Sequence, residues 1–120
     1  MSLETDLMTY LEAQALACSD RIYPVQLPQT PTLPAMVYAQ VSIVTADVAH
    51  DGQSVYELGR YQFDCYAQKY GDAKALALAL KSTLRNWGAY EIYFENLLDL
   101  SEYELDRYRM TVEFLIGGAD

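Results

Sequence analysis

The sequence predicts an α+β fold, a mainly antiparallel sheet of about four strands with two helices packed on one face. Two segments carry apolar residues at helical spacing, and four segments alternate apolar with polar residues as strands do. The order along the chain is helix, strand, strand, helix, strand, strand, which is compatible with such a layer pair. A chain of 120 residues is expected to form a single domain, residues 1–120.

The first predicted helix covers residues 3–17. Leu3, Leu7, Leu11 and Ala15 recur at every fourth position, as expected of one helix face. Ser2 is a plausible N-cap, and acidic residues follow it in the first turn, where the helix dipole favours negative charge.

All four prolines lie within residues 24–34, directly after this helix. Because proline fixes φ and lacks a backbone donor, the segment is neither helix nor central strand. We expect a stiff, extended crossing that leads into a strand at residues 35–45, where Val37, Ala39, Val41 and Ile43 share one face.

Residues 46–59 are predicted to be a weakly structured connection that holds an Asp51-Gly52 turn signal. If the flanking strands are antiparallel, this segment is a long hairpin loop. Residues 60–68 alternate again and predict a half-buried strand.

The second helix is expected over residues 72–87, because Leu76, Leu80, Leu84 and Trp87 form a continuous ridge. Two more strands are expected at residues 90–100 and 107–116. The short polar connection between them, residues 101–106, indicates a second hairpin.

Charge and hydropathy exclude several classes of protein. A net charge of −9 opposes binding to nucleic-acid phosphate. No apolar run is long enough to cross a membrane, and the acidic N-terminal segment does not resemble a signal peptide, so a cytoplasmic origin is the default. The acidic residues between positions 91 and 106 form either a solvated hairpin or a surface that orients a protein partner.

Catalytic and metal-binding patterns are absent from the sequence. His50 is the sole histidine and lies in the expected loop, and Glu91, Glu95 and Asp99 share a face only if their strand is regular. Cys18 and Cys65 lack metal-ligand spacing and are expected to be buried, reduced thiols, with a disulfide as the alternative. We therefore expect neither an enzyme nor a cofactor or metal.

Eleven tyrosines exceed what a small core is expected to bury with every hydroxyl satisfied. Tyrosine is favoured at protein interfaces because it adds contact area at little entropic cost. The alternative is that about half of them are ordinary aromatic residues on the sheet surface.

An ordered set of segments resembles a family of short tailed-phage proteins, the tail-terminator or tail-completion components. The set begins with Met-Ser-Leu-Glu and a helix, and it ends with an alanine- and leucine-rich helix, an acidic stretch and a strand opening Arg107-Tyr108-Arg109. Between them lie Asp20-Arg21-Ile22-Tyr23-Pro24, Leu27-Pro28-Gln29, Leu33-Pro34-Ala35 before Val37-Tyr38, and Gln62-Phe63-Asp64-Cys65-Tyr66-Ala67. The chain departs from the resemblance at Gly117-Gly118, where an aromatic ending is expected.

The resemblance implies a structural virion component of a phage or prophage, assembled in the host cytoplasm, that caps the tail tube as a ring, often hexameric. Its implied partners are further copies of itself, the tail-tube protein and the head–tail connector. The other hypothesis is a small dimeric α+β module that binds an apolar ligand or a peptide. Candidate interface residues come from the proline crossing, the first strand and the long loop: Tyr23, Pro24, Leu27, Pro28, Tyr38, Asp47, His50, Asp51 and Tyr56.

Overall fold

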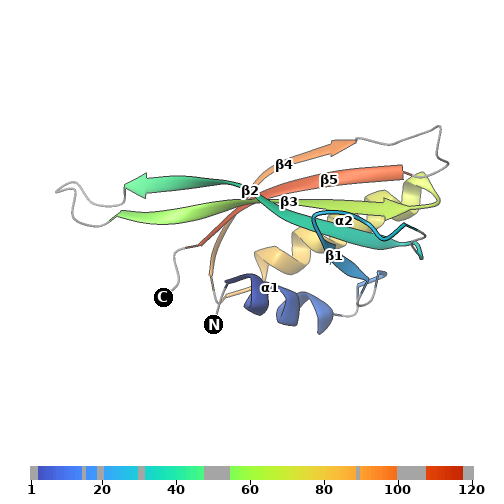
Figure 1. Cartoon of the computed structure of the whole chain (residues 1–120), viewed down its shortest axis with the longest axis horizontal. Helices are drawn as coiled ribbons and strands as arrows, with labels where there is room; N and C mark the ends of the chain where they lie inside the picture. The colour runs from blue at the N-terminus through green and yellow to red at the C-terminus, as the bar shows by residue number, and fades with distance from the viewer. Residues whose placement is uncertain are drawn as a thin grey trace.

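The structure, a computed structural model, describes residues 3–14, 16–18, 21–29, 32–47, 55–88, 90–99 and 108–117. These residues form two helices and a five-stranded sheet (Figure 1). In chain order the elements are α1 (Leu3–Glu12), β1 (Ile22–Pro24), β2 (Ala35–Asp47), β3 (Val55–Ala67), α2 (Tyr70–Arg85), β4 (Glu91–Asp99) and β5 (Tyr108–Gly117).

The sheet has the strand order β1-β2-β3-β5-β4 and is mixed. Neighbours β2, β3, β5 and β4 are antiparallel, whereas β1 pairs with β2 in parallel, with Ile22 opposite Met36 and Pro24 opposite Tyr38. The α+β class is confirmed, but the prediction of about four strands in a mainly antiparallel sheet was wrong. Ile22–Pro24 is a fifth strand at the edge of the sheet, because the proline crossing brings the next strand, β2, alongside it in parallel. At an edge, Pro24 removes no hydrogen bond from the centre of the sheet.

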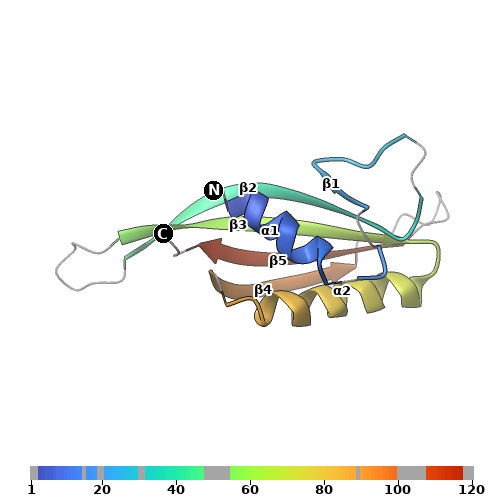
Figure 2. The same cartoon turned by 90° about the horizontal axis from the view of Figure 1, so that it is seen from below.

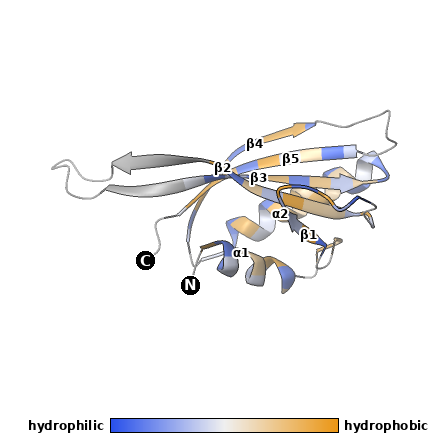
Figure 3. Ribbon diagram, in the orientation of Figure 1, coloured by the Kyte–Doolittle hydropathy of each residue, from blue (hydrophilic) through white to orange (hydrophobic). Residues whose placement is uncertain are grey.

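Both helices lie on the same face of the sheet, as predicted (Figures 1 and 2). Between helices and sheet, the leucine ridge of α2 and Leu7 and Leu11 of α1 are buried against alternate side chains of β3 and β5. Phe63 and Phe114 meet edge to face at the centre, with ring centroids 6.2 Å apart. In Figure 3 hydrophobic and hydrophilic positions accordingly alternate along the strands and helices.

Aromatic residues join α1 to the C-terminal end of α2. The Tyr10 ring stacks on Trp87 at 5.1 Å between centroids, and its hydroxyl donates to the Thr83 carbonyl oxygen at 2.8 Å. The Tyr90 hydroxyl, just before β4, donates to the Asp6 carboxylate at 2.6 Å. These tyrosines therefore help to hold the two helices and the start of β4 together.

The helix boundaries differ from the predicted ones. α1 ends at Glu12 rather than at residue 17, and Leu16 and Cys18 still enter the core after the helix has ended. α2 begins at Tyr70 rather than at residue 72, so Gly71 and Asp72 lie in its first turn and Lys69 takes the N-cap position without a side-chain cap. Side-chain spacing identified the buried faces, but tertiary contacts set where each helix stops.

The β2–β3 hairpin is longer than predicted. Backbone pairing continues to Asp47 opposite Val55, so residues 46–47 and 55–59 belong to strands and the expected loop was wrong at both of its ends, whereas residues 48–54 lie outside the described residues. β-branched and aromatic residues favour strand there, and the two strands satisfy each other's backbone groups. β5 pairs with β3 only as far as Leu58 opposite Gly117, so the end of the hairpin projects beyond the rest of the sheet (Figure 1).

A close approach explains the glycine at position 59 of the hairpin. A Cβ atom there would lie 2.6 Å from a ring carbon of Tyr61, which is closer than carbon atoms can approach. Because glycine has no side chain, the Tyr61 ring can pack against the backbone at position 59.

Candidate functional site

The face of the sheet that the helices leave uncovered has a buried polar centre. Asp64 is only 8% exposed and accepts a 2.6 Å hydrogen bond from the Thr111 hydroxyl. The Arg109 guanidinium lies 3.3 Å from the same carboxylate, and the Gln62 amide donates to it at 3.4 Å. The Asp64 carboxylate thus interacts with three side chains, and removing one of them would leave a buried charge less well compensated.

A second ion pair on this face links β3 to β4. Arg60 Nε lies 2.7 Å from a Glu95 carboxylate oxygen, which raises the pKa of the already cationic Arg60. Glu95 lies at an irregularity in β4 between Phe94 and Asn96. Because of this bulge, Glu91, Glu95 and Asp99 do not share the regular face that a carboxylate pair would need.

Some apolar side chains of β2 and β4 are exposed. Val41 and Tyr93 are 48% and 47% exposed, and Leu98, opposite Thr111, is 37% exposed. Single exposed apolar residues are ordinary on protein surfaces and do not by themselves identify a partner.

An acidic hollow lies at the β2 side of the helix layer. Glu4, Thr5, Met8, Thr9 and Glu12 of α1 line it together with Tyr38 of β2, around a volume of about 520 Å³. Burial, and then the negative charge of Glu4, raise the pKa of the Tyr38 hydroxyl. Tyr38 therefore adds a neutral aromatic side chain to a hollow that Glu4 and Glu12 make acidic.

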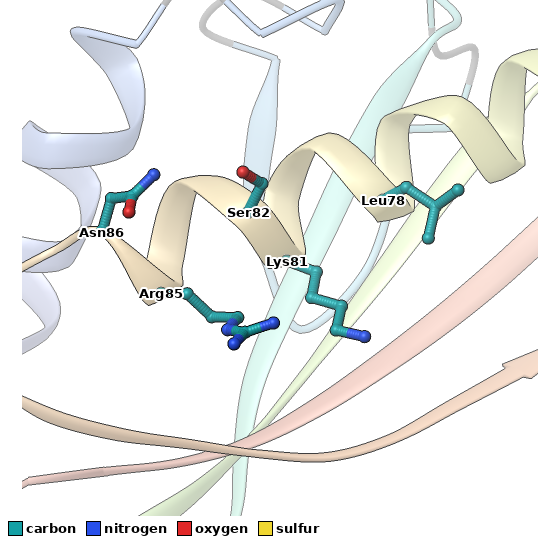
Figure 4. A pocket seen from close by; sticks show the side chains of 5 residues that line it. All are labelled: Leu78, Lys81, Ser82, Arg85 and Asn86. Atoms are coloured by element: carbon teal, nitrogen blue, oxygen red, sulfur yellow. The ribbon is translucent and has the colours of Figure 1, made fainter.

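A basic hollow of about 410 Å³ lies on α2, at the other side of the helix layer (Figure 4). Leu78, Lys81 and Arg85 leave the helix on one side in this view, and Ser82 and Asn86 complete the lining. The Lys81 ammonium is placed 4.1 Å from the centroid of the Phe94 ring, a cation–π contact that anchors it beside β4. Leu78 is 47% exposed among these basic groups.

The structure brings some of the predicted interface residues together at the β1 edge. Pro24 pairs opposite Tyr38, and the chain then turns at Val25, whose φ of 69° is unusual for a β-branched residue. Leu27 is half-buried and Pro28 is exposed just beyond this turn, whereas Tyr23 is half-buried within β1. This part of the predicted surface is continuous with the acidic hollow through Tyr38.

Two further predicted residues lie at the far end of the described part of the hairpin. Asp47 pairs opposite Val55, and Tyr56 pairs opposite Ala46. His50 and Asp51 lie outside the described residues. The seven predicted residues that the structure describes are therefore divided between the β1 edge and the hairpin.

Sequence reasoning missed the two charged hollows. Their side chains occupy the helix positions opposite the leucine stripes, so a charge count by helix face could have found them: α1 carries exposed glutamates there and α2 carries lysines and an arginine.

The described residues show no metal or membrane feature. They contain no group of three or more metal-ligating His, Cys, Asp or Glu side chains. Within the same ranges, neither helix has the length and apolarity that crossing a membrane requires. Cys18 and Cys65 are buried, reduced thiols, as predicted, and burial raises the pKa of the Cys65 thiol well above its ordinary value.

Comparisons with known proteins identify the family. The model of the tail completion protein gp17 family matches residues 2–117, nearly the entire chain. The chain belongs to this family. The resemblance in the sequence to tail-completion proteins is thus confirmed.

A solved structure shares the fold of this tail-completion protein. One chain in the virion of a native gene transfer agent particle superposes with a TM-score of 0.66 at 15% identity, over 93% of this chain and 95% of that one. No curated protein matches the sequence significantly.

Proposed function

We propose that this protein completes the phage tail by capping the tail tube as a ring and joining it to the head connector. The observation that carries the proposal is the family match over residues 2–117. The shared fold with a chain of a gene transfer agent virion supports a place in the assembled particle. Assembly then takes place in the host cytoplasm before the subunits enter the virion.

The projecting hairpin supports contact with a neighbouring protein. Residues 43–47 of β2 pair with residues 55–59 of β3, whereas β5 pairs with β3 only as far as Leu58. A ribbon of two strands is marginally stable alone in water, so a partner that packs against it stabilises it. We assign this contact to the tail tube or to an adjacent subunit, through Asp47, His50, Asp51 and Tyr56.

The charged surface supports assembly on a template. A net charge of −9 makes free subunits repel each other at low ionic strength. The tube end would overcome this repulsion by holding several subunits close together. We assign the β1 edge, with Tyr23, Pro24, Leu27 and Pro28, to the contact with the head connector.

The alternative, a dimeric module for an apolar ligand or peptide, requires a closed pocket lined by tyrosines. The acidic and basic hollows are lined by polar and charged side chains, with Tyr38 as their one tyrosine. They do not favour a small apolar ligand.

Deletion of the gene from its phage or prophage tests the proposal. We expect tail tubes without attached heads, seen by electron microscopy, and restoration of complete particles when the wild-type gene is supplied from a plasmid. Mass spectrometry of purified particles should find the protein in the restored virions. Complete, infectious particles from the deletion strain would contradict the proposal.

A further inference from the structure

The two charged hollows have matching patterns of charged and apolar residues. In α1, Met8 lies between Glu4 and Glu12, four residues from each. In α2, exposed Leu78 lies between Lys74 and Lys81, and Arg85 follows one turn later. At a rise of about 1.5 Å per residue, the glutamates are about 12 Å apart along α1 and the lysines about 10.5 Å apart along α2.

The two patterns face in opposite directions. On α1, Asp6 and Tyr10 point toward the end of α2, where they contact Tyr90 and Thr83, so Glu4, Met8 and Glu12 occupy the side away from α2. On α2, Thr83 marks the side toward α1, and Lys74, Leu78 and Lys81 occupy the side away from it. The acidic side meets β2, and the basic side meets β4 through the Lys81–Phe94 contact.

We propose that the basic face of α2, defined by Lys74, Leu78, Lys81 and Arg85, docks into the acidic α1 hollow of a second copy of this chain. Leu78 packs against Met8 and Tyr38 of that copy, and the lysines pair with the glutamates on either side. The partner is another copy because each chain carries both the basic face of α2 and the acidic hollow that complements it. Charge attraction favours the basic face against the acidic hollow over arrangements in which two basic or two acidic faces meet.

The direction of the two faces determines the type of assembly. A two-fold dimer would have to use both contacts between the same two subunits, which faces pointing away from each other do not allow. The contact is therefore head-to-tail, and repetition of it closes a ring or extends a filament. This inference rests on the proposed ring and identifies the surfaces that hold it together.

Charge reversal tests the contact in solution. One variant carries Glu4→Lys and Glu12→Lys, and the other carries Lys74→Glu and Lys81→Glu. By sedimentation velocity at physiological ionic strength, where salt screens the general repulsion between free subunits, each variant alone should associate at least about tenfold more weakly than wild type, because local repulsion replaces exposed ion pairs. An equimolar mixture should regain wild-type association, since every contact in an alternating ring again joins opposite charges.

The acidic-side variant separates this contact from general repulsion. Glu4→Lys with Glu12→Lys moves the net charge toward zero, so general repulsion predicts tighter association, whereas the proposed contact predicts weaker association. Asp72→Lys with Glu91→Lys is the charge-matched control at exposed positions outside both hollows, and it should not weaken association. Wild-type or tighter association of the acidic-side variant, or no recovery in the mixture, would overturn the inference.

Cross-linking tests the same contact in assembled tails. A chain with both Met8→Cys and Leu78→Cys, treated with a short bismaleimide, should give a ladder of oligomers, while either single substitution should give none. The native Cys18 and Cys65 are fully buried and do not compete. Complete tails without a ladder would refute this contact alone, whereas a chain that forms no oligomer in solution or in tails would refute the ring as well.

Discussion

Asp64 is a carboxylate held at 8% exposure on a sheet face that has no helix above it. Its hydrogen bond from Thr111 and its ion pair with Arg109 join β3 to β5 at the centre of that face. Alternation in the strand placed Asp64 on this face, but the sequence offered no sign that Thr111 stands opposite it and that Arg109, opposite Tyr66, reaches it diagonally. Cross-strand register determines such pairs.

Thr111→Val removes the hydroxyl donor and keeps the shape of the side chain. We expect a loss of about 1–2 kcal/mol in the free energy of unfolding, because the buried carboxylate loses a charge-assisted hydrogen bond. Urea denaturation measures the loss. Arg60→Gln, which breaks the more exposed pair with Glu95, is the control and should destabilise the fold less than Thr111→Val does. Equal losses in both variants would contradict the special role of the buried pair.

Tyr61 gives the fold a pH dependence in the alkaline range. Burial, and then the negative charge of Glu4, raise the pKa of its hydroxyl to about 12. The unfolded chain then releases this proton near pH 10 while the folded chain keeps it. The stabilisation is complete below about pH 10 and is lost as the pH rises to about 12.

Thermal melting at pH 9 to 12 measures this dependence. The wild-type melting temperature should fall more steeply across that range than the melting temperature of Tyr61→Phe, which has no proton to release. Parallel curves for the two proteins would show that Tyr61 does not titrate with a raised pKa.

At the scale of elements, α2 was the most predictable. Its leucine ridge is continuous, and the structure buries Leu76, Leu80 and Leu84 completely or almost so. The ends of α1 and the strand β1 were less predictable because local spacing does not encode them. Ile22–Pro24 is a strand only because Met36–Tyr38 lies beside it.

Leu80→Ala tests the ridge. The side chain is fully buried, so its truncation should cost about 2–5 kcal/mol through lost transfer free energy and a cavity. Leu78→Ala is the matched control on the same helix, where the exposed side chain has little to lose. Chemical denaturation compares them, and a loss near zero for Leu80→Ala would show that α2 does not pack as described.

At the scale of the whole molecule, the sequence anticipated two helices on one sheet face and a family of tail proteins. The expected loop was wrong at both ends, because residues 46–47 and 55–59 extend the strands, and the candidate interface residues remain a prediction. The charged hollows were missed, since each forms only when a helix lies at the edge of the sheet. Their residues were visible in the sequence, but their positions relative to each other were not.

Removing the projecting part of the hairpin separates folding from assembly. Deletion of residues 44–50 and 53–58 leaves Asp51-Gly52 as a two-residue turn between Ile43 and Gly59, which already pair. We expect a folded protein with a melting temperature near that of wild type, because the core lies outside the deleted segment. In complementation of the deletion strain it should fail to give complete tails. Normal tails from this shortened protein would remove the hairpin from the mechanism.

The central claim is that this chain forms a closed ring at the end of the tail tube. Cryo-electron microscopy of the head–tail junction in purified virions tests it most directly. We predict a ring of copies of this fold on the last tube layer, with the basic face of α2 in each copy against α1 of the next and the hairpins contacting the tube or a neighbour. A junction whose density contains no copy of this fold, or only a single copy, would contradict the claim.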